Sequence, residues 1–408
     1  MYRQLANHND DIRRLVEKGY AVAVDSSGYL IVRDIPYLDA NRALQVGAFV
    51  TKLVYTTPEK VKQHNHQVFF TGSSPHNIDG TPIKLIGDNP ASLTLSASSP
   101  DIVVTRQFSN KLLVNGQMVD YPDFFAKIEN YRTLISGPAM ALFPNEAKVF
   151  TFRKIETDND SVFKIADTLT GRAEIMDLSQ KFKDEVVVVI GLGGTGAYLL
   201  DFLTKTAVKE IRGFDGDVFH IHSQFRSPGR FDGTEGAEFE RPKADVYQAR
   251  YENLRHGLKL THKYIDSTCA EDLKGATFAF VAVDKGSSRK EIFKLLIALK
   301  IPFIDVGMGL DRNQGPLSGQ LRATYYSPED AQARMDQEFA MLVDHLDAEY
   351  RLNIQIPELN ALNATLAIIQ YKKIKGFYFD STTDFHFVFR VPDTKIVARS
   401  KDDEAQQD

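Results

Sequence analysis

A glycine-rich turn in the second half of this 408-residue chain has the composition needed to hold a phosphate group. The apolar run Val186–Ile190 is followed by Gly191, Gly193, Gly194 and Gly196, and then by a helical pattern. We expect Gly191 to permit a tight turn, Gly193 to let backbone N–H groups approach a phosphate, and Gly196 to bring the helix close to its strand. The helix N-terminus adds a favourable dipole, so the turn predicts an anion-binding site.

An acidic residue follows at the distance expected for ribose recognition. Asp215 ends the next apolar run, nineteen residues after Gly196, where its carboxylate can accept hydrogen bonds from a ribose diol. NAD-dependent enzymes and enzymes that use ATP share this pattern. The turn and the acid alone therefore leave both classes open.

Charged residues further along the chain favour ATP. A triphosphate carries more negative charge than the pyrophosphate bridge of a dinucleotide, so it needs more cations to balance it. Asp217 comes two residues after Asp215, Arg226 lies in the following loop, and Lys243 stands at an expected helix start. The sequence therefore indicates a site for a nucleoside triphosphate.

The elements around these residues alternate between apolar runs and helical patterns. Such alternation predicts an α/β domain with a doubly wound, mostly parallel Rossmann-like sheet over residues 156–398. Residues 1–155 combine β-rich runs with two helical patterns and predict a smaller α+β accessory domain, joined through the linker ETDNDS. The polar residues 399–408 are expected to form a disordered tail.

Composition excludes several classes of protein. A net charge of −5 and a pI near 6.1 do not provide the broad cationic surface that binds nucleic acid. The single cysteine, Cys269, excludes an internal disulfide and a Cys-rich zinc site. The polar N-terminus and the shortness of the apolar runs give no signal peptide or membrane anchor, so we expect a cytoplasmic protein.

Five motifs in order resemble those of the ThiF, MoeB and ubiquitin-activating enzyme superfamily. They are GLGGTG, FDGD, SQFR, PKA and VAVDKGSSR, and the resemblance covers about residues 183–375. It implies a ThiF-like adenylation domain that uses ATP and Mg²⁺. Asp215 and Asp217 would then hold the ribose, and Arg226 and Lys243 would bind the phosphates. Asp284, at the end of FAFVAVD, would ligate Mg²⁺, which prefers oxygen ligands.

The resemblance also assigns three residues outside that set. Gln224 stands where relatives commonly carry an asparagine beside the ATP, so its longer side chain is a departure from the pattern. Arg289 is at the family's usual arginine position. Arg172, upstream of the glycine turn, lies where relatives have an arginine that reaches the ATP site of the partner in a homodimer.

The chemistry that the resemblance implies is adenylation of a peptide carboxylate. The carboxylate attacks the α-phosphorus of ATP, and cations and metal stabilise the departing pyrophosphate. The substrate would be the C-terminal glycine of a ubiquitin-like protein, because the N-terminal region resembles the extra unit that precedes ThiF-like domains in bacterial ubiquitin-like conjugation operons. A conjugating enzyme would be a further partner.

Three rival functions differ in the residues that they require. A sulfur-carrier adenylyltransferase for thiamin or molybdopterin synthesis commonly has zinc-binding cysteines or a crossover cysteine, and this chain has neither. A NAD-dependent oxidoreductase has no need of Arg226, Lys243 and Asp284. A binding scaffold with a decayed nucleotide site is disfavoured because these residues and Asp215 are all present.

The acyl acceptor, if there is one, stays open in the sequence. Cys269 precedes Asp284, whereas the family's thioester-forming cysteine follows the metal-binding aspartate, so a structural role is favoured. Ser318 or Ser327 could accept the acyl group as an oxyester, or the adenylate could pass directly to a partner. Asp305 at another strand end could equally face the substrate or cap a turn.

Overall fold

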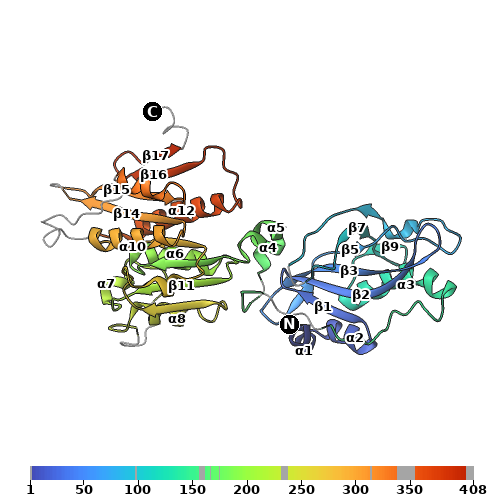
Figure 1. Ribbon diagram of the computed structural model, residues 1–408. Coiled ribbons are helices and arrows are strands. Elements are labelled where there is room, and N and C mark those ends of the chain that lie inside the picture. Colours follow the sequence, from blue (N-terminus) through green and yellow to red (C-terminus); the bar gives the residue numbers. More distant parts are fainter. Residues whose placement is uncertain are drawn as a thin grey trace. The chain divides into compact units, whose positions relative to one another are not determined.

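The computed structural model divides the chain into two compact units, Met1–Gln180 and Lys181–Asp408 (Figure 1). This division lies later in the chain than the 155/156 boundary expected from the sequence. Most of the predicted linker and residues 401–408 of the predicted tail lie outside the described residues, whereas Arg399 and Ser400 are the last residues of a strand. The structure describes residues 2–96, 99–155, 161–165, 167–173, 175–230, 238–312, 315–337 and 354–400.

The N-terminal unit is an α+β domain, as expected. Its main sheet has the strand order β1-β2-β3-β5-β7-β6, with β4 beside β3, and every pairing is antiparallel. Its strands are β1 (Ala21–Asp25), β2 (Tyr29–Leu38), β3 (Leu44–Tyr55), β4 (Val61–Gln63), β5 (Gln67–Thr71), β6 (Asn89–Pro90), β7 (Val104–Ser109) and the separate hairpin β8 (Leu112–Val114) and β9 (Gln117–Val119). Its helices are α1 (Tyr2–His8), α2 (Asp10–Lys18), η1 (Lys84–Ile86), α3 (Phe124–Leu142), α4 (Thr168–Ala173) and α5 (Met176–Ser179).

Helix α3 covers the sheet through one apolar stripe. Phe124, Ile128, Tyr131 and Ile135 recur every three or four residues and are fully buried. Asp123 caps the helix by accepting a hydrogen bond from the backbone N–H of Ala126.

A lysine interrupts this apolar interface. Lys127 has no exposed surface, and its ammonium group donates to the hydroxyl of Thr51 at 2.6 Å and to the carbonyl oxygen of Asn65 at 3.0 Å. Burial lowers the pKa of Lys127 to about 7, because a low-dielectric interior disfavours the charged form.

Stability is therefore expected to rise with pH above neutrality. Between a folded pKa near 7 and the ordinary lysine value of 10.5, the unfolded chain binds a proton that the folded chain does not. Between about pH 8 and pH 10, the free energy of unfolding of the wild type should rise with pH more steeply than that of Lys127→Met. The difference between the two slopes should reach up to ~1.4 kcal/mol per pH unit. The exposed Lys148→Met should behave as wild type. An identical pH dependence in the Lys127→Met protein contradicts the expectation.

The C-terminal unit is an α/β domain around one eight-stranded sheet, in the order β12-β11-β10-β13-β14-β15-β16-β17. The first five strands are parallel and the last three are added antiparallel, so the expected mostly parallel Rossmann-like sheet is confirmed. Its strands are β10 (Val186–Ile190), β11 (Glu210–Asp215), β12 (Leu258–His262), β13 (Phe278–Val281), β14 (Phe303–Asp311), β15 (Ser318–Tyr326), β16 (Asp384–Arg390) and β17 (Lys395–Ser400). Its helices are α6 (Gly194–Thr204), α7 (Ile221–Gln224), α8 (Lys243–Tyr251), α9 (Ala270–Leu273), α10 (Gly286–Ala298), α11 (Ala331–Asp336) and α12 (Pro357–Ile374), and η2 (Gln180–Phe182) precedes them.

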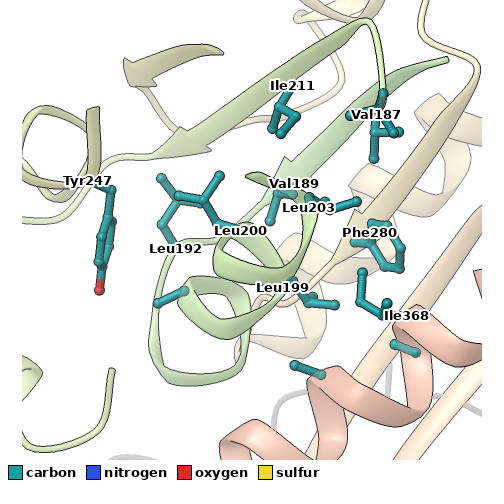
Figure 2. Close-up of a cluster of buried hydrophobic side chains, with 14 of the residues drawn as sticks. Val187, Val189, Leu192, Leu199, Leu200, Leu203, Ile211, Tyr247, Phe280 and Ile368 are labelled. Carbon is teal, nitrogen blue, oxygen red and sulfur yellow. The ribbon is translucent and has the colours of Figure 1, made fainter. Parts of the chain in front are cut away.

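The central parallel strands β10 and β13 and the start of β14 are buried on both faces, which explains their continuous apolar runs. Val187 and Val189 of β10 face the cluster that includes α6, α8 and α12, which Figure 2 shows with Phe280 and Ile368. Alternate residues such as Val188 pack instead with α10. Among the described residues, no helix is long and apolar enough to span a membrane.

The strand order fixes where a ligand can bind. The chain proceeds from β10 outward to β11 and β12, and it then returns past β10 to β13 and β14. This reversal opens a crevice at the carboxyl ends of the parallel strands, where ligands bind in open α/β sheets.

Candidate functional site

The glycine turn after β10 has the geometry that its composition predicted. Gly191 adopts φ of +92°, and its N–H donates to the carbonyl oxygen of Phe214 at 2.8 Å. A Cβ on Gly196 would overlap the carbonyl oxygen of Gly191, so only glycine lets α6 start against the turn. A Cβ on Gly193 would meet nothing within 4 Å, so this side of the turn is open to a ligand.

The start of α12 closes the other side of the turn. A Cβ on Gly194 would overlap the side chain of Asn360, which is 1% exposed. Asn360 accepts a hydrogen bond from the Thr195 hydroxyl at 3.0 Å and donates to the carbonyl oxygen of Arg226 at 3.2 Å. It thus ties the turn to the loop that carries Arg226. Asn360 was not expected in the site from the sequence, although a polar asparagine among the apolar residues of a helix is a feature that could have indicated it.

Two aspartates and a lysine form the charged floor of the site. The ammonium group of Lys243, at the start of α8, lies 2.6 Å from Asp217 Oδ2 and 3.5 Å from Asp215 Oδ1. The Lys243 side chain is 6% exposed, and Asp217 is 54% exposed. Asp215 is turned inward, because its Oδ2 accepts from the N–H of Leu192 at 2.7 Å and its Oδ1 from the N–H of Asp217 at 2.8 Å. Asp217 is therefore the carboxylate with access to a ligand.

Asp217 stays ionised over a wide pH range. Partial burial raises its pKa, but hydrogen bonds from Lys243 and Tyr264 and the positive charges of Lys243 and Arg226 outweigh burial, so the pKa lies below its ordinary value. An ionised carboxylate is an acceptor only, which suits recognition of hydroxyl groups.

A cavity of about 440 Å³ opens above this floor. Its lining combines cations with one carboxylate and two histidines, and a smaller hollow beside the glycine turn shares Ser223, Arg226 and Lys243 with it. The cavity is lined by Gly216, Asp217, Val218, His220, His222, Ser223, Arg226, Lys243 and Tyr264, and the hollow adds Leu192, Gly193, Gly194, Ser227 and Tyr247.

The two histidines do not make a metal site in the described part of the chain. His220 is paired with Glu240 at 2.9 Å, and burial together with the charges of Arg226 and His220 lowers the pKa of His222. No group of three or more metal-binding side chains occurs among the described residues.

Asp284 lies in the loop between β13 and α10 and is exposed at the carboxyl edge of the sheet. A single carboxylate fits Mg²⁺, which keeps several waters and is usually held by one or two carboxylates together with substrate phosphates. Asp284 thus suits a metal ion that is shared with a nucleotide.

Three of the predicted ligands in the C-terminal unit, Asp215, Gln224 and Asp284, are not among the residues that line the cavity or the hollow. The amide oxygen of Gln224 accepts from Arg250 at 2.8 Å, and its amide nitrogen donates to the carbonyl oxygen of Gly229, so both ends contact protein. Arg172 lies in α4 of the N-terminal unit, and its side chain is outside the described residues.

Asp305 has a structural role that the sequence left open. It has no exposed surface and lies between two arginines, with Oδ1 at 3.1 Å from Arg289 Nε and Oδ2 at 2.6 Å from Arg322 Nη1. Arg289 also donates to the carbonyl oxygen of Val283 at 2.6 Å, next to Asp284. This triad of Arg289, Asp305 and Arg322 therefore holds the segment that follows β13 in place.

The candidate acyl acceptors differ in access. Cys269 is 2% exposed, with Sγ 3.5 Å from Asp266 Oδ1, and Ser327 is 4% exposed and accepts from the N–H of Asp330. Both therefore have inward-facing side chains. Ser318, at the start of β15, is partly exposed.

Several solved structures resemble the chain at low identity. PaaA has 17% identity and a TM-score of 0.41, over 57% of this chain and 71% of PaaA. MccB of E. coli with ATP has 17% identity and a TM-score of 0.43, over 55% of this chain and 65% of MccB. MccB of E. coli with MccA has 17% identity and a TM-score of 0.42, over 55% of this chain and 66% of MccB.

Two sequence families match consecutive parts of the chain, up to residue 332. Residues 169–332 match the ThiF family, and residues 10–168 match a domain of unknown function, DUF6791. No curated protein matches the chain significantly. The C-terminal half of the chain therefore contains a ThiF family domain, which follows an N-terminal domain of unknown function.

Proposed function

We propose that the C-terminal unit uses ATP and Mg²⁺ to adenylate the C-terminal carboxylate of a protein or peptide. The observation that carries this proposal is the convergence of Arg226, Lys243 and Asp217 on one cavity, which shares Arg226 and Lys243 with the hollow at the glycine turn. The match to the ThiF family supports the reaction class. Lys243 and Arg226 are the cations that a triphosphate needs, and the start of α6 offers its positive dipole end.

The reaction needs no general base. A carboxylate oxygen of the substrate forms a bond to the α-phosphorus of ATP, and the bond from that phosphorus to the bridging oxygen of the β-phosphate breaks. The leaving pyrophosphate takes the electron pair, and no proton moves, because a terminal carboxylate is already ionised near neutral pH. Arg226 and Lys243 orient the phosphates and offset the developing charge.

Asp284 is the residue that we propose to hold Mg²⁺. The metal ion would supply Lewis-acid stabilisation of the phosphate oxygens. Asp217 would accept hydrogen bonds from the ribose, since it is the more accessible of the two floor aspartates. Asp215 would then act through the turn, which it holds by its hydrogen bond to Leu192.

The finer proposal is that the substrate is a ubiquitin-like protein ending in glycine, which feeds a bacterial conjugation pathway. The order of the five motifs and the large N-terminal domain favour this substrate. We include in the proposal a homodimer in which Arg172 reaches the partner's site, and a conjugating enzyme as a further partner. With a sulfur-carrier protein as the substrate, the adenylation step would be the same, and only the later reaction of the adenylate would differ.

The test is ATP–pyrophosphate exchange by the purified full-length protein with candidate ubiquitin-like proteins ending in glycine. Exchange should require the partner's C-terminal glycine and should fall at least ~100-fold in Asp284→Ala, because a metal-held charge on the phosphates is lost. Glu291→Ala, an exposed acid on the following helix α10, is the matched control and should retain exchange. Cys269→Ser should also retain exchange, since adenylate formation needs no thiol.

Two outcomes contradict this function. Full exchange in Asp284→Ala removes the proposed metal ligand. Absence of exchange with every partner, combined with binding of NAD(H), favours the oxidoreductase class instead.

A further inference from the structure

Tyr264 lines the candidate cavity from the segment that follows β12. It lies just beyond β12 and lines the cavity together with Asp217 and Lys243. Its side chain is 68% exposed, which is unusual for a large aromatic residue with fixed contacts.

Two contacts hold this exposed ring in place. The Tyr264 hydroxyl donates to Asp217 Oδ1 at 2.6 Å, while the other oxygen of Asp217 is bound to Lys243. The ring lies so close to Gly216 that a Cβ there would overlap it. The residue before Tyr264 is also held in place, because the N–H of Lys263 donates to the carbonyl oxygen of Asp215 at 3.1 Å.

The hydroxyl remains a donor at any ordinary pH. Its hydrogen bond to Asp217 raises the pKa of Tyr264 to about 12. Both oxygens of Asp217 are therefore oriented before a ligand arrives. Each carboxylate oxygen can still accept a second hydrogen bond, which leaves capacity for a hydroxyl of the ligand.

The strand order places the ring where the base of a nucleotide would lie. The glycine turn follows β10, Asp215 and Asp217 come at the end of the adjacent β11, and Tyr264 comes after the next strand, β12. A nucleotide with phosphates at the turn and ribose at Asp217 must therefore extend its base toward the end of β12.

We propose that Tyr264 is a nucleotide-binding residue, with its ring as the platform for the base and its hydroxyl as the group that positions Asp217 for the ribose. This inference rests on the proposed ATP-dependent function. An aromatic face attracts any base by stacking, and an exposed face that is fixed in advance loses little entropy on binding.

Calorimetric titration of the full-length protein with ATP and Mg²⁺ tests both roles without a protein substrate. Tyr264→Ala removes both the ring and the hydroxyl and should weaken ATP binding about thirtyfold, since stacking on one aromatic side chain contributes about tenfold. Tyr264→Phe keeps the ring and should weaken ATP binding about threefold through the loss of one hydrogen bond to a charged group.

A ligand without ribose hydroxyls separates the ring from the hydroxyl. With 2′,3′-dideoxy-ATP, Tyr264→Phe should bind as tightly as wild type, while Tyr264→Ala should bind only about tenfold more weakly, because the ring alone still contributes. Gly216→Ala should reproduce the effect of Tyr264→Ala, because the added methyl group displaces the ring. Tyr378→Ala, another partly exposed tyrosine of the same unit outside the cavity lining, should bind like wild type.

The results distinguish this inference from the function on which it rests. If Tyr264→Ala binds ATP as tightly as the wild type, the ring is not a platform for the base, and the proposed function is unaffected. Equal weakening of ATP and 2′,3′-dideoxy-ATP by Tyr264→Phe overturns the positioning of Asp217. Absence of ATP binding by the wild type overturns the proposed function and this inference with it.

Discussion

Replacement of Lys243 by alanine is expected to lower ATP–pyrophosphate exchange about a thousandfold, the upper range for removing one group that stabilises developing charge. The ammonium group of Lys243 contacts the carboxylates of Asp215 and Asp217, and Lys243 lines both the cavity and the smaller hollow at the glycine turn. Its loss removes a positive charge from the phosphates and leaves Asp217 to repel them. Exchange is to be measured at saturating ATP, so that loss of chemistry is separated from loss of binding.

Lys243→Ala also affects the folded protein, and this must be measured beside the exchange. Breaking a buried ion pair from one side leaves an uncompensated charge, here Asp215, and costs ~3–5 kcal/mol in well-buried cases. Without Lys243, the carboxylates of Asp215 and Asp217 repel each other. The double variant Lys243→Ala with Asp217→Asn removes one of these charges, so it should melt at a higher temperature than Lys243→Ala while staying inactive. Lys259→Ala, which removes an exposed lysine paired with Glu210, is the matched control. Exchange by Lys243→Ala above a tenth of the wild-type rate contradicts the phosphate role.

The second large effect is expected from a matched pair of glycine substitutions in the turn. Gly193→Ala should leave the melting temperature near that of wild type, because its Cβ meets no protein atom within 4 Å. The same Cβ would face the open side of the turn, where we propose that a phosphate binds, so ATP binding should fall at least ~100-fold by overlap with the phosphate.

In Gly196→Ala, by contrast, the main effect should be on the melting temperature and not on direct contact with ATP. Its Cβ overlaps the carbonyl oxygen of Gly191, so α6 must move from the turn and the melting temperature should fall markedly. Thermal unfolding and ATP titration of both variants form the measurement. Equal destabilisation by the two substitutions, or full ATP binding by Gly193→Ala, contradicts the assignment of an open and a closed side to the turn.

The parts of the site that follow one strand directly could be predicted from the sequence. Gly191 and Gly196 come just after β10, so local backbone requirements determine their geometry. The alternation of apolar runs and helices likewise indicated the sheet, because buried parallel strands leave a continuous apolar signature. Lys243 was also placed correctly at a helix start.

The rest depends on contacts between distant segments, which no local pattern contains. Asn360 meets Thr195 across 165 positions of sequence, and Tyr264 meets Asp217 across 47. The direction of a side chain is equally invisible in the sequence. The sequence favoured Asp215 as the ribose acceptor, yet backbone N–H groups draw Asp215 inward, and Arg250 binds the amide oxygen of Gln224.

The triad beneath the end of β13 has an electrostatic consequence. Two arginines, Arg289 and Arg322, lie against the single buried carboxylate of Asp305. Val281, the last residue of β13, is in register with Asp305, which sets these ion pairs next to the carboxyl edge of the sheet. Salt screens buried ion pairs much less than it screens pairs on the surface. The triad should therefore keep its geometry at ionic strengths that weaken the exposed ion pairs of the domain.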